Sequence, residues 1–463
     1  MSPDGTGPSG TTEVFATFCR QQVATRAGNR GRRRIGGSML DWSDEQLAMR
    51  TAVRDFVERE VVPRREELEH GDLAPYDLLR NYVRTFGIDE IARERFERET
   101  SGGPPFTTEE RYERAVLTLL PMVEFCRHCP GLVTAMGVSM NLAGNAIKRG
   151  TPEQRERWAL PLLTLDKVGA WAITEPDSGS DAFGGMRSSA VRDGDEFVLN
   201  GSKTFITNGP HADTTVFICK LDDGTTPSRE RKVLSFVLDR GMPGFEQSPP
   251  LRKMGLHSSP TGELFLSDVR VGIDRLIGGP AVLEDRPAGG RPAASDDATK
   301  KDGAAKKDAR EAARATFASE RASIAAMALG LIEQCEDISV DYARNRVQFG
   351  RPIGDFQLIQ AKLADMEVAR VNVRNMLFRY LETVRSGGSL TFAEASAIKL
   401  YAARAATAVA LDAVQVLGGN GYMAEFHVEQ LARDAKVLQI YAGTDELQIT
   451  AIAKDLLRRP ATR

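Results

Sequence analysis

Two polar segments in the middle of the chain contain residue types that could bind a flat, polar ligand. Residues 174–181 (TEPDSGSD) form a turn rich in Gly, Ser and Asp, and residues 200–209 (NGSKTFITNG) surround Phe205 with small hydroxyl side chains. Exposed backbone amides and Ser or Thr hydroxyls can hydrogen-bond a polar heterocycle while an aromatic ring lies against its face. Asn-Gly stands at both ends of the second segment, so two ordinary hairpin turns remain the alternative.

Two further segments lie in the last third of the chain. Residues 344–360 (RNRVQFGRPIGDFQLIQ) place arginines beside a glycine, and guanidinium groups can clamp a pyrophosphate bidentately. Residues 415–422 (QVLGGNGY) precede polar clusters at 433–436 and 440–446, and their glycines would let the backbone approach a ligand closely. The alternatives are a helix end with solvated arginines and a glycine helix stop, which leaves the later polar cluster unexplained. No G-x-G-x-x-G follows a strand, so a Rossmann-type site is not indicated.

The elements that must position these segments change in type along the chain. Ser43 and Gln46 have the form of a capping box, and helical spacing then continues, with breaks, to about residue 165. Short strands are predicted at 196–199, 215–219, 233–238 and 263–266, and a long helical region with rows such as Ile324, Leu331 and Ile338 follows. The expected order is helical, β, helical. The segments are an N-terminal tail (1–38, disordered or over-extended), a helical domain (39–165), a β-domain (166–279), a low-complexity insert predicted to be a flexible surface loop (280–312) and a helical bundle (313–463).

Composition narrows the class of protein. The chain has 463 residues, 41% hydrophobic residues and a net charge of −3, which predicts a soluble globular protein and gives no case for nucleic acid. No apolar run approaches the roughly 20 residues that span a bilayer, so no membrane anchor is expected. Scattered cysteines predict a reducing compartment, the cytoplasm, with the mitochondrial matrix as the alternative if residues 1–38 are a transit peptide. Cys126 and Cys129 form a lone C-x-x-C without further ligands, so no metal site is predicted.

The four segments, in this order and on this layout, resemble the acyl-CoA dehydrogenase family from about Trp42 to Leu457, without the insert. The resemblance implies a multi-domain α+β fold with an N-terminal helical domain, a middle β-barrel-like domain and a C-terminal four-helix bundle. It also implies a homotetramer that uses FAD to convert an acyl-CoA thioester to the trans-2-enoyl-CoA. A base removes the α-proton, a hydride passes from the β-carbon to flavin N5, and the electrons then go to an electron-transfer flavoprotein.

The resemblance assigns individual residues to the cofactor and the substrate. The flavin contacts that it implies on the β-domain are Thr174, Ser180, Phe205 (often Trp in relatives) and Thr207. The residues implied to reach the FAD of a neighbouring subunit are Arg346, Gln348, Phe349 and Gln357, with Gln415, Gly418 and Gly419 as a further inter-subunit set. Thr444 and Glu446 match positions near the adenosine-diphosphate part of FAD. The implied substrate contacts are Ser180, Arg321, Tyr441, Ala442 and Gly443.

The catalytic base is not where many relatives carry it. Those relatives have a Glu immediately before the Gly-Thr of the last segment, where this chain has Ala442. Isovaleryl-type and long-chain-type members instead place the Glu before an Arg on the first long helix of the C-terminal domain, and Glu320-Arg321 matches that pattern.

Helical geometry supports Glu320 independently. At about 100° per residue Glu320 projects within roughly 40° of the apolar row Ile324, Met327, Leu331 and Ile338, where an unpaired carboxylate is costly. The alternative is a solvated glutamate at a helix start. The backbone N–H of Ala442 can still polarise the thioester carbonyl. Two departures from the family pattern, His257 and Ala318, leave the acyl group unpredicted.

Two other readings of the same fold stay open. An oxidase or flavin monooxygenase would pass the electrons to oxygen. A non-catalytic partner subunit would lack FAD, or would hold FAD that acyl-CoA does not bleach.

Overall fold

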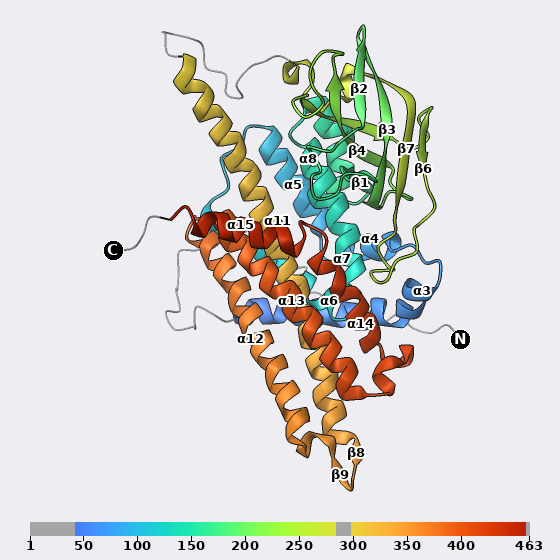
Figure 1. Ribbon diagram of the computed structural model, residues 1–463, viewed down its shortest axis with the longest axis vertical. Helices are drawn as coiled ribbons and strands as arrows, with labels where there is room; N and C mark the ends of the chain where they lie inside the picture. Colours follow the sequence, from blue (N-terminus) through green and yellow to red (C-terminus); the bar gives the residue numbers. More distant parts are fainter. Residues whose placement is uncertain (1–41, 284–297, 460–463) are drawn as a thin grey trace, which may run out of the picture.

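The computed structural model of the protein describes residues 42–283 and 298–459, with side chains over 42–283 and 320–459 (Figure 1). The N-terminal tail (1–38) and residues 284–297 of the predicted insert lie outside the described residues. A helical N-terminal part, a sheet and a C-terminal helical bundle follow one another, which confirms the expected order.

Short helices make up the N-terminal part. The capping box at Ser43 is confirmed, since its hydroxyl accepts from the Gln46 backbone and the Gln46 side chain accepts from the Ser43 backbone. The α-helices are α2 (Asp44–Phe56), α3 (Arg65–His70), α4 (Tyr76–Thr85), α5 (Ile88–Thr100), α6 (Thr108–Cys126), α7 (Pro130–Gly137), α8 (Asn145–Ile147), α9 (Pro152–Gln154) and α10 (Leu160–Leu163). Asn208 attaches this part to the sheet, because its side-chain amide donates to the carbonyls of Ala135 and Gly169 at 2.9 Å each.

The middle of the chain forms one curled, mixed sheet. Its strands are β1 (Gly169–Ala172), β2 (Ser189–Asp193), β3 (Glu196–Thr207), β4 (Thr214–Asp222), β5 (Val233–Asp239), β6 (Phe245–Gln247) and β7 (Thr261–Gly272). The order is β1-β4-β2-β3-β7-β6, with β5 on the other side of β4. All four predicted strands lie within β3, β4, β5 and β7. The register of β3 against β7 shifts between Lys203 and Ile206, a β-bulge that re-aims the intervening side chains.

The C-terminal bundle consists of α11 (Ala298–Asn345), α12 (Gln357–Arg385), α13 (Phe392–Leu417), α14 (Val428–Lys436) and α15 (Asp445–Leu456). A small hairpin, β8 (Val347–Gln348) with β9 (Arg351–Pro352), connects α11 to α12. The prediction of a surface loop is wrong for residues 298–312, because α11 already begins at Ala298 (Figure 1). Ala, Lys and Glu in this sequence have high intrinsic helix propensity, so a low-complexity composition does not by itself predict a loop.

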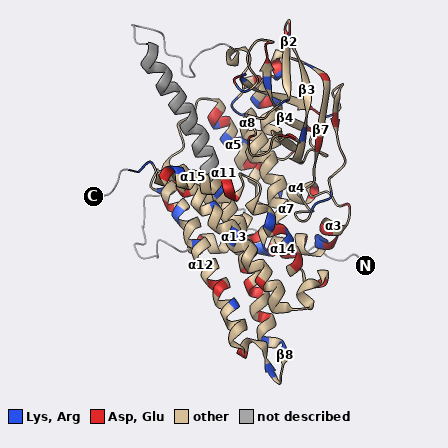
Figure 2. Cartoon of the chain, in the orientation of Figure 1, with Lys and Arg blue, Asp and Glu red and all other residues tan. Residues whose placement is uncertain are grey.

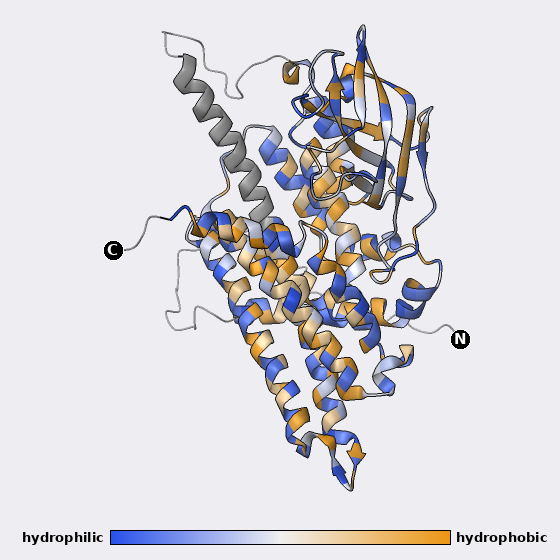
Figure 3. Cartoon of the chain, viewed as in Figure 1, coloured by the Kyte–Doolittle hydropathy of each residue, from blue (hydrophilic) through white to orange (hydrophobic). Residues whose placement is uncertain are grey.

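Helix α13 is the core of the bundle. By length and composition it is long and apolar enough to cross a membrane, contrary to the expectation that no such run exists. It packs against α11, α12, α14 and α15, however, and hydrophilic residues interrupt its apolar ones (Figure 3). Lys399, Arg404 and Asp412 lie on it and each contacts another segment of the chain. These features are those of a buried core helix.

Candidate functional site

Glu320 lies half-buried on α11. Burial raises the pKa of its carboxyl, and the guanidinium of the adjacent Arg321 opposes that rise. Ile324 and Leu331, on the same face of the helix, are buried in the main core, which confirms the predicted apolar row. A carboxylate in this setting is a stronger base than one in water, which is the property that proton abstraction requires.

Arg321 turns its side chain toward the start of α13. Its guanidinium donates to the Phe392 carbonyl at 3.2 Å and to the Ser396 hydroxyl at 2.9 Å, and it lies 3.9 Å from the centre of the Phe392 ring. Burial lowers the pKa of Arg321 to about 10, while Glu320 acts in the opposite direction. Arg321 therefore fixes the segment that carries Glu320 against α13.

We call residues 441–445 the 441–445 loop, and its first residue contacts α11. The Tyr441 hydroxyl donates to the Met327 sulfur at 3.3 Å, on α11 two turns beyond Glu320. Burial raises the pKa of Tyr441 well above its usual range, and the charge of Glu320 contributes to that rise. The fold therefore places Tyr441, which Ala442 and Gly443 follow in the chain, within reach of the charge of Glu320.

The backbone of the 441–445 loop is unusual. Ala442 has φ 51° and Gly443 has φ 87°, so two consecutive residues occupy conformations that L side chains rarely adopt. The Gly443 carbonyl accepts from Lys399 Nζ and from Gln448 Nε2, each at 2.9 Å. Thr444 then precedes the first residue of α15, and the exposed Glu446 has its pKa lowered by its own backbone N–H and by Thr444.

The predicted flavin contacts of the β-domain lie on β3, where Phe205 lies in the bulge and Thr207 follows it, and on the 174–181 turn, which carries Thr174 and Ser180. Phe205, at φ 57°, is 70% exposed between the buried Thr204 and Ile206, and Thr207 is half-buried. The Thr204 N–H donates to the Thr174 carbonyl at 2.9 Å, which joins the 174–181 turn to this strand; Ser180 in that turn is exposed. An exposed aromatic flanked by hydroxyls and turn amides fits a polar heterocycle.

A buried ion pair holds this turn in place. Lys203 Nζ donates to the Glu175 carboxylate at 2.8 Å and to the Ile173 carbonyl at 3.0 Å. The same carboxylate accepts from the backbone of Arg187 and Ser188. Burial acts to raise the pKa of Glu175, but these hydrogen bonds outweigh it and the pKa is lowered. These bonds hold the 174–181 turn against β3 and the start of β2.

The predicted inter-subunit FAD contacts lie at the end of the bundle away from that surface within one chain. We call residues 346–352 the 346–352 hairpin; it projects from the end of the bundle opposite the β-domain and is marked by basic residues (Figures 1 and 2). Arg346, Gln348 and Gln357 are exposed, and Phe349 is 93% exposed. The other predicted inter-subunit residues, Gln415, Gly418 and Gly419, are also exposed, at the nearby end of α13, where Asn420 hydrogen-bonds Tyr342 of α11 at 3.1 Å.

Sequence reasoning missed the residues that hold the site. Lys399 and Gln448, both fully buried, clamp the 441–445 loop, and the pair Glu175–Lys203 clamps the 174–181 turn. One signal was available for Lys399. It shares a helical face with Ala395, Ala402 and Ala406, and a lysine on an apolar face requires a specific partner.

His257, one of the departures, has a structural environment. Its Nδ1 lies 2.8 Å from the Glu69 carbonyl and its Nε2 lies 2.8 Å from the Lys253 carbonyl. It therefore joins the β-domain to α3. Cys126 and Cys129 are both buried, and burial raises the pKa of Cys129 to about 12. Within the described residues, no three His, Cys, Asp or Glu side chains gather as a metal site.

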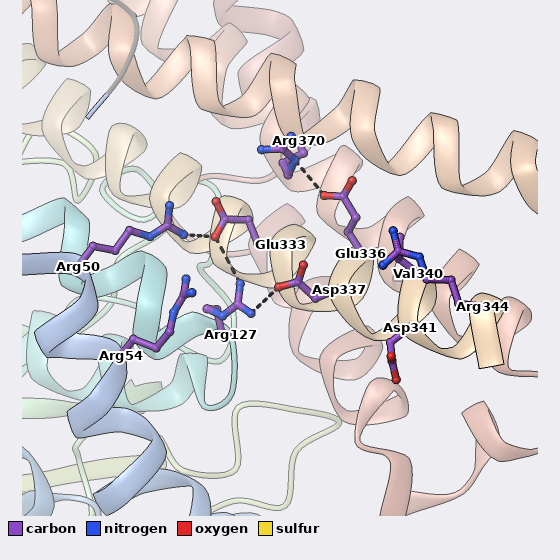
Figure 4. Close-up of a pocket in the computed structure, with 10 residues that line it drawn as sticks. All are labelled: Arg50, Arg54, Arg127, Glu333, Glu336, Asp337, Val340, Asp341, Arg344 and Arg370. Atoms are coloured by element: carbon purple, nitrogen blue, oxygen red, sulfur yellow. Dashed lines mark hydrogen bonds and ion pairs between the residues drawn. The ribbon is translucent and has the colours of Figure 1, made fainter. Parts of the chain in front are cut away.

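A cavity of about 480 Å³ between α2, α6, α11 and α12 is lined almost entirely by charged side chains (Figure 4). Three of its arginines are paired with acidic residues of the cavity: Arg50 contacts Glu333, Arg127 contacts Asp337 at 2.7 Å, and Arg370 contacts Glu336 at 2.9 Å. None of the predicted site residues lines it. Ion pairs in this cavity therefore join the N-terminal helices to the bundle, and Glu320 does not line it.

Comparison with known proteins agrees with this geometry. Models of the N-terminal, middle and C-terminal domains of acyl-CoA dehydrogenase match residues 43–166, 170–269 and 310–457. An acyl-CoA dehydrogenase of Bacillus subtilis is 36% identical over 417 residues, 90% of this chain and 98% of that protein.

Solved structures give the same result. Butyryl-CoA dehydrogenase from Megasphaera elsdenii superimposes with a TM-score of 0.72 at 30% identity, covering 90% of this chain and 99% of that chain. A chain from the structure of the electron transferring flavoprotein of Acidaminococcus fermentans gives a TM-score of 0.70 at 28% identity, with 90% and 99% coverage. The chain therefore belongs to the acyl-CoA dehydrogenase family of flavin-dependent oxidoreductases.

Proposed function

We propose that the protein dehydrogenates an acyl-CoA thioester to the trans-2-enoyl-CoA, with Glu320 as the base that removes the α-proton. The observation that carries this proposal is the position of Glu320. It is a carboxyl whose pKa is raised by burial, and it lies close enough to the 441–445 loop for its charge to reach Tyr441. Because the side chain of Ala442 cannot accept a proton, Glu320 is the carboxylate of this site that can act as a base.

The 441–445 loop supplies the complementary group. Removal of the α-proton places negative charge on the thioester oxygen, and a fixed N–H donor stabilises that charge. We assign this donor to the backbone amide of Ala442, with Ser180, Tyr441 and Gly443 as further substrate contacts. The bonds from Arg321 to Phe392 and Ser396 support a role in orienting Glu320 beside the substrate.

The residues that would hold FAD fall into two groups. Thr174, Ser180, Phe205 and Thr207 would hold the ring system of one subunit's flavin, and Thr444 and Glu446 would lie near its adenosine diphosphate. Bound FAD would accept the hydride from the β-carbon. Arg346, Gln348, Phe349, Gln357, Gln415, Gly418 and Gly419 would bind the FAD of a neighbour in a homotetramer, which is consistent with their exposure in one chain.

We further propose an electron-transfer flavoprotein as the electron acceptor and the cytoplasm as the location. The first rests on the similarity to a chain from the structure of the electron transferring flavoprotein of Acidaminococcus fermentans. The second rests on cysteines that are free and buried, as Cys126, Cys129, Cys219 and Cys335 are.

Anaerobic mixing of the FAD-loaded protein with a panel of straight and branched acyl-CoA thioesters tests the proposal. We expect at least one thioester to bleach the flavin and yield the 2-enoyl product, and the reduced protein to pass electrons to an electron-transfer flavoprotein without steady peroxide release. Steady release of hydrogen peroxide on aerobic turnover would identify an oxidase. Failure of the whole panel to bleach bound flavin would identify a non-catalytic subunit.

A further inference from the structure

We infer that Lys399, on α13, is a positioning residue: through the Gly443 carbonyl it holds the 441–445 loop in the conformation that presents the Ala442 amide to the substrate. This inference rests on the proposed function for the role of that amide. The clamp itself is a property of the folded chain. Lys399 touches no reacting atom of the proposed reaction and acts through the backbone carbonyl of Gly443.

The environment of Lys399 singles out one acceptor. Its side chain is fully buried, and its Nζ donates to the Gly443 carbonyl at 2.9 Å. Asp445, its nearest anion, is farther away at 3.7 Å and has its own partner in Arg404 Nε at 2.9 Å. A lysine buried only to neutralise a carboxylate would make its short contact with that carboxylate. The short contact of Lys399 is with the backbone.

The loop needs such a clamp. Ala442 at φ 51° is a non-glycine residue in the left-handed region, a conformation that persists only when surrounding contacts enforce it. The next residue, Gly443, has φ 87°, and a Cβ there would lie 2.8 Å from Gln448 Nε2. Lys399 and Gln448 approach the same carbonyl from α13 and α15, so two helices fix the peptide plane between Gly443 and Thr444. Gln448 Nε2 also donates to the Ala442 carbonyl at 3.4 Å, in the peptide plane that follows Ala442.

Helix α13 thereby connects both halves of the site. One turn before Lys399, Ser396 accepts from Arg321, the neighbour of Glu320. The positive charge of Arg321 is among the causes that lower the pKa of Lys399, after burial, so the two cations lie close together. Adjacent turns of one buried helix therefore hold the neighbour of the proposed base Glu320 and the loop that carries the proposed backbone donor Ala442. Displacement of a reacting group by about 1 Å is enough to cost on the order of 100-fold in rate.

The test uses the FAD-loaded protein, the acyl-CoA that reduces the wild type fastest, and three variants. Lys399→Met removes the donor and the charge while keeping the length of the side chain. The double variant Lys399→Met/Asp445→Asn also removes the carboxylate of Asp445, which in the single variant has lost the nearby charge of Lys399. Lys436→Met is the matched control, because Lys436 is exposed, lies five residues before Tyr441 and donates to Gln439. The readouts are the anaerobic flavin-reduction rate, the affinity for acyl-CoA, and amide hydrogen exchange over residues 437–447.

For both Lys399 variants we expect flavin reduction to slow by roughly 10- to 100-fold with little change in acyl-CoA affinity, because a fixed donor acts in the transition state. Exchange over residues 437–447 should accelerate in both, even without FAD, and the control should match the wild type. Recovery of the wild-type rate in the double variant would overturn the inference, because Lys399 would then serve only to balance Asp445. Unchanged exchange in Lys399→Met would overturn it as well. Absence of bleaching in the wild type would contradict the proposed function instead, and the exchange measurement would still decide whether the clamp exists.

Discussion

The 441–445 loop and the 346–352 hairpin lie in the same helical bundle and were both predicted to serve the active site, yet their surroundings are opposite. The Gly443 carbonyl accepts two side-chain hydrogen bonds from buried residues, and the charge of Glu320 reaches Tyr441 of the same loop. The hairpin leaves Arg346, Gln348 and Phe349 exposed to solvent. Within one chain, the residues that would do the chemistry are therefore packed in the bundle. The predicted FAD contacts on the hairpin face solvent instead. In the proposed homotetramer, the hairpin is where a neighbouring chain would contribute to the site.

The largest expected effect belongs to the loop side of this comparison. Glu320→Gln keeps the shape of the side chain but cannot accept the α-proton. We expect flavin reduction to slow by about 10²- to 10⁴-fold, with FAD still bound, in anaerobic stopped-flow measurements. Glu336→Gln is the matched control: it lies on the same helix, and burial raises its pKa to about 7, but it pairs with Arg370 in the charged cavity. An equal slowing of flavin reduction in both variants would contradict the assignment of Glu320 as the base.

A second prediction compares a glycine from each region. Gly443→Ala adds a strained positive φ and a contact with the buried Gln448, so we expect a loss of about 2–4 kcal/mol in the free energy of unfolding. Gly350→Ala, in the turn of the hairpin, has a φ of 79° but open space around its Cβ, so about 1–2 kcal/mol is expected. Denaturant titration of both variants measures the difference. Equal losses would mean that the loop is no more tightly packed than the hairpin.

The third and smallest expected effect concerns the hairpin alone. Arg346→Ala removes an exposed side chain, so the melting temperature of the FAD-free protein should stay within the error of the wild type. If Arg346 binds the FAD of a neighbour, the affinity for FAD should fall by about 10- to 100-fold, the range of a charge-assisted hydrogen bond. Thermal melting of the FAD-free protein measures the first quantity, and titration of the FAD-free protein with FAD measures the second. Unchanged FAD affinity would assign the hairpin no part in the site.

Local patterns predicted much of this architecture. The capping box at Ser43, the four strands and the apolar row on α11 follow from spacing over a few residues, and all are present. The start of α11 at Ala298 was missed, because composition alone does not separate a polar helix from a loop.

The partners within the site could not be read from local pattern. Lys399 and Gly443 are 44 residues apart, and Glu320 and Tyr441 are farther apart still. Only the packing of α11, α13 and α15 brings them together, and hydrophobic periodicity identifies the buried face of a helix without identifying what it faces. The resemblance to the family identified the candidate site residues. The hydrogen bond from Lys399 to Gly443 could be found only from the packing of the helices.

The central claim is that each chain carries its own base but borrows the 346–352 hairpin from a neighbour. Co-expression of a Glu320→Gln chain with an Arg346→Ala/Phe349→Ala chain, each with its own affinity tag, tests it. Hybrids that carry both tags would be assayed at an FAD concentration that leaves the second parent mostly unloaded. We predict activity well above the sum of the two parents, because the chain with an intact Glu320 receives an intact hairpin. Hybrids no more active than that sum, or an inability of the two chains to assemble at all, would contradict the claim.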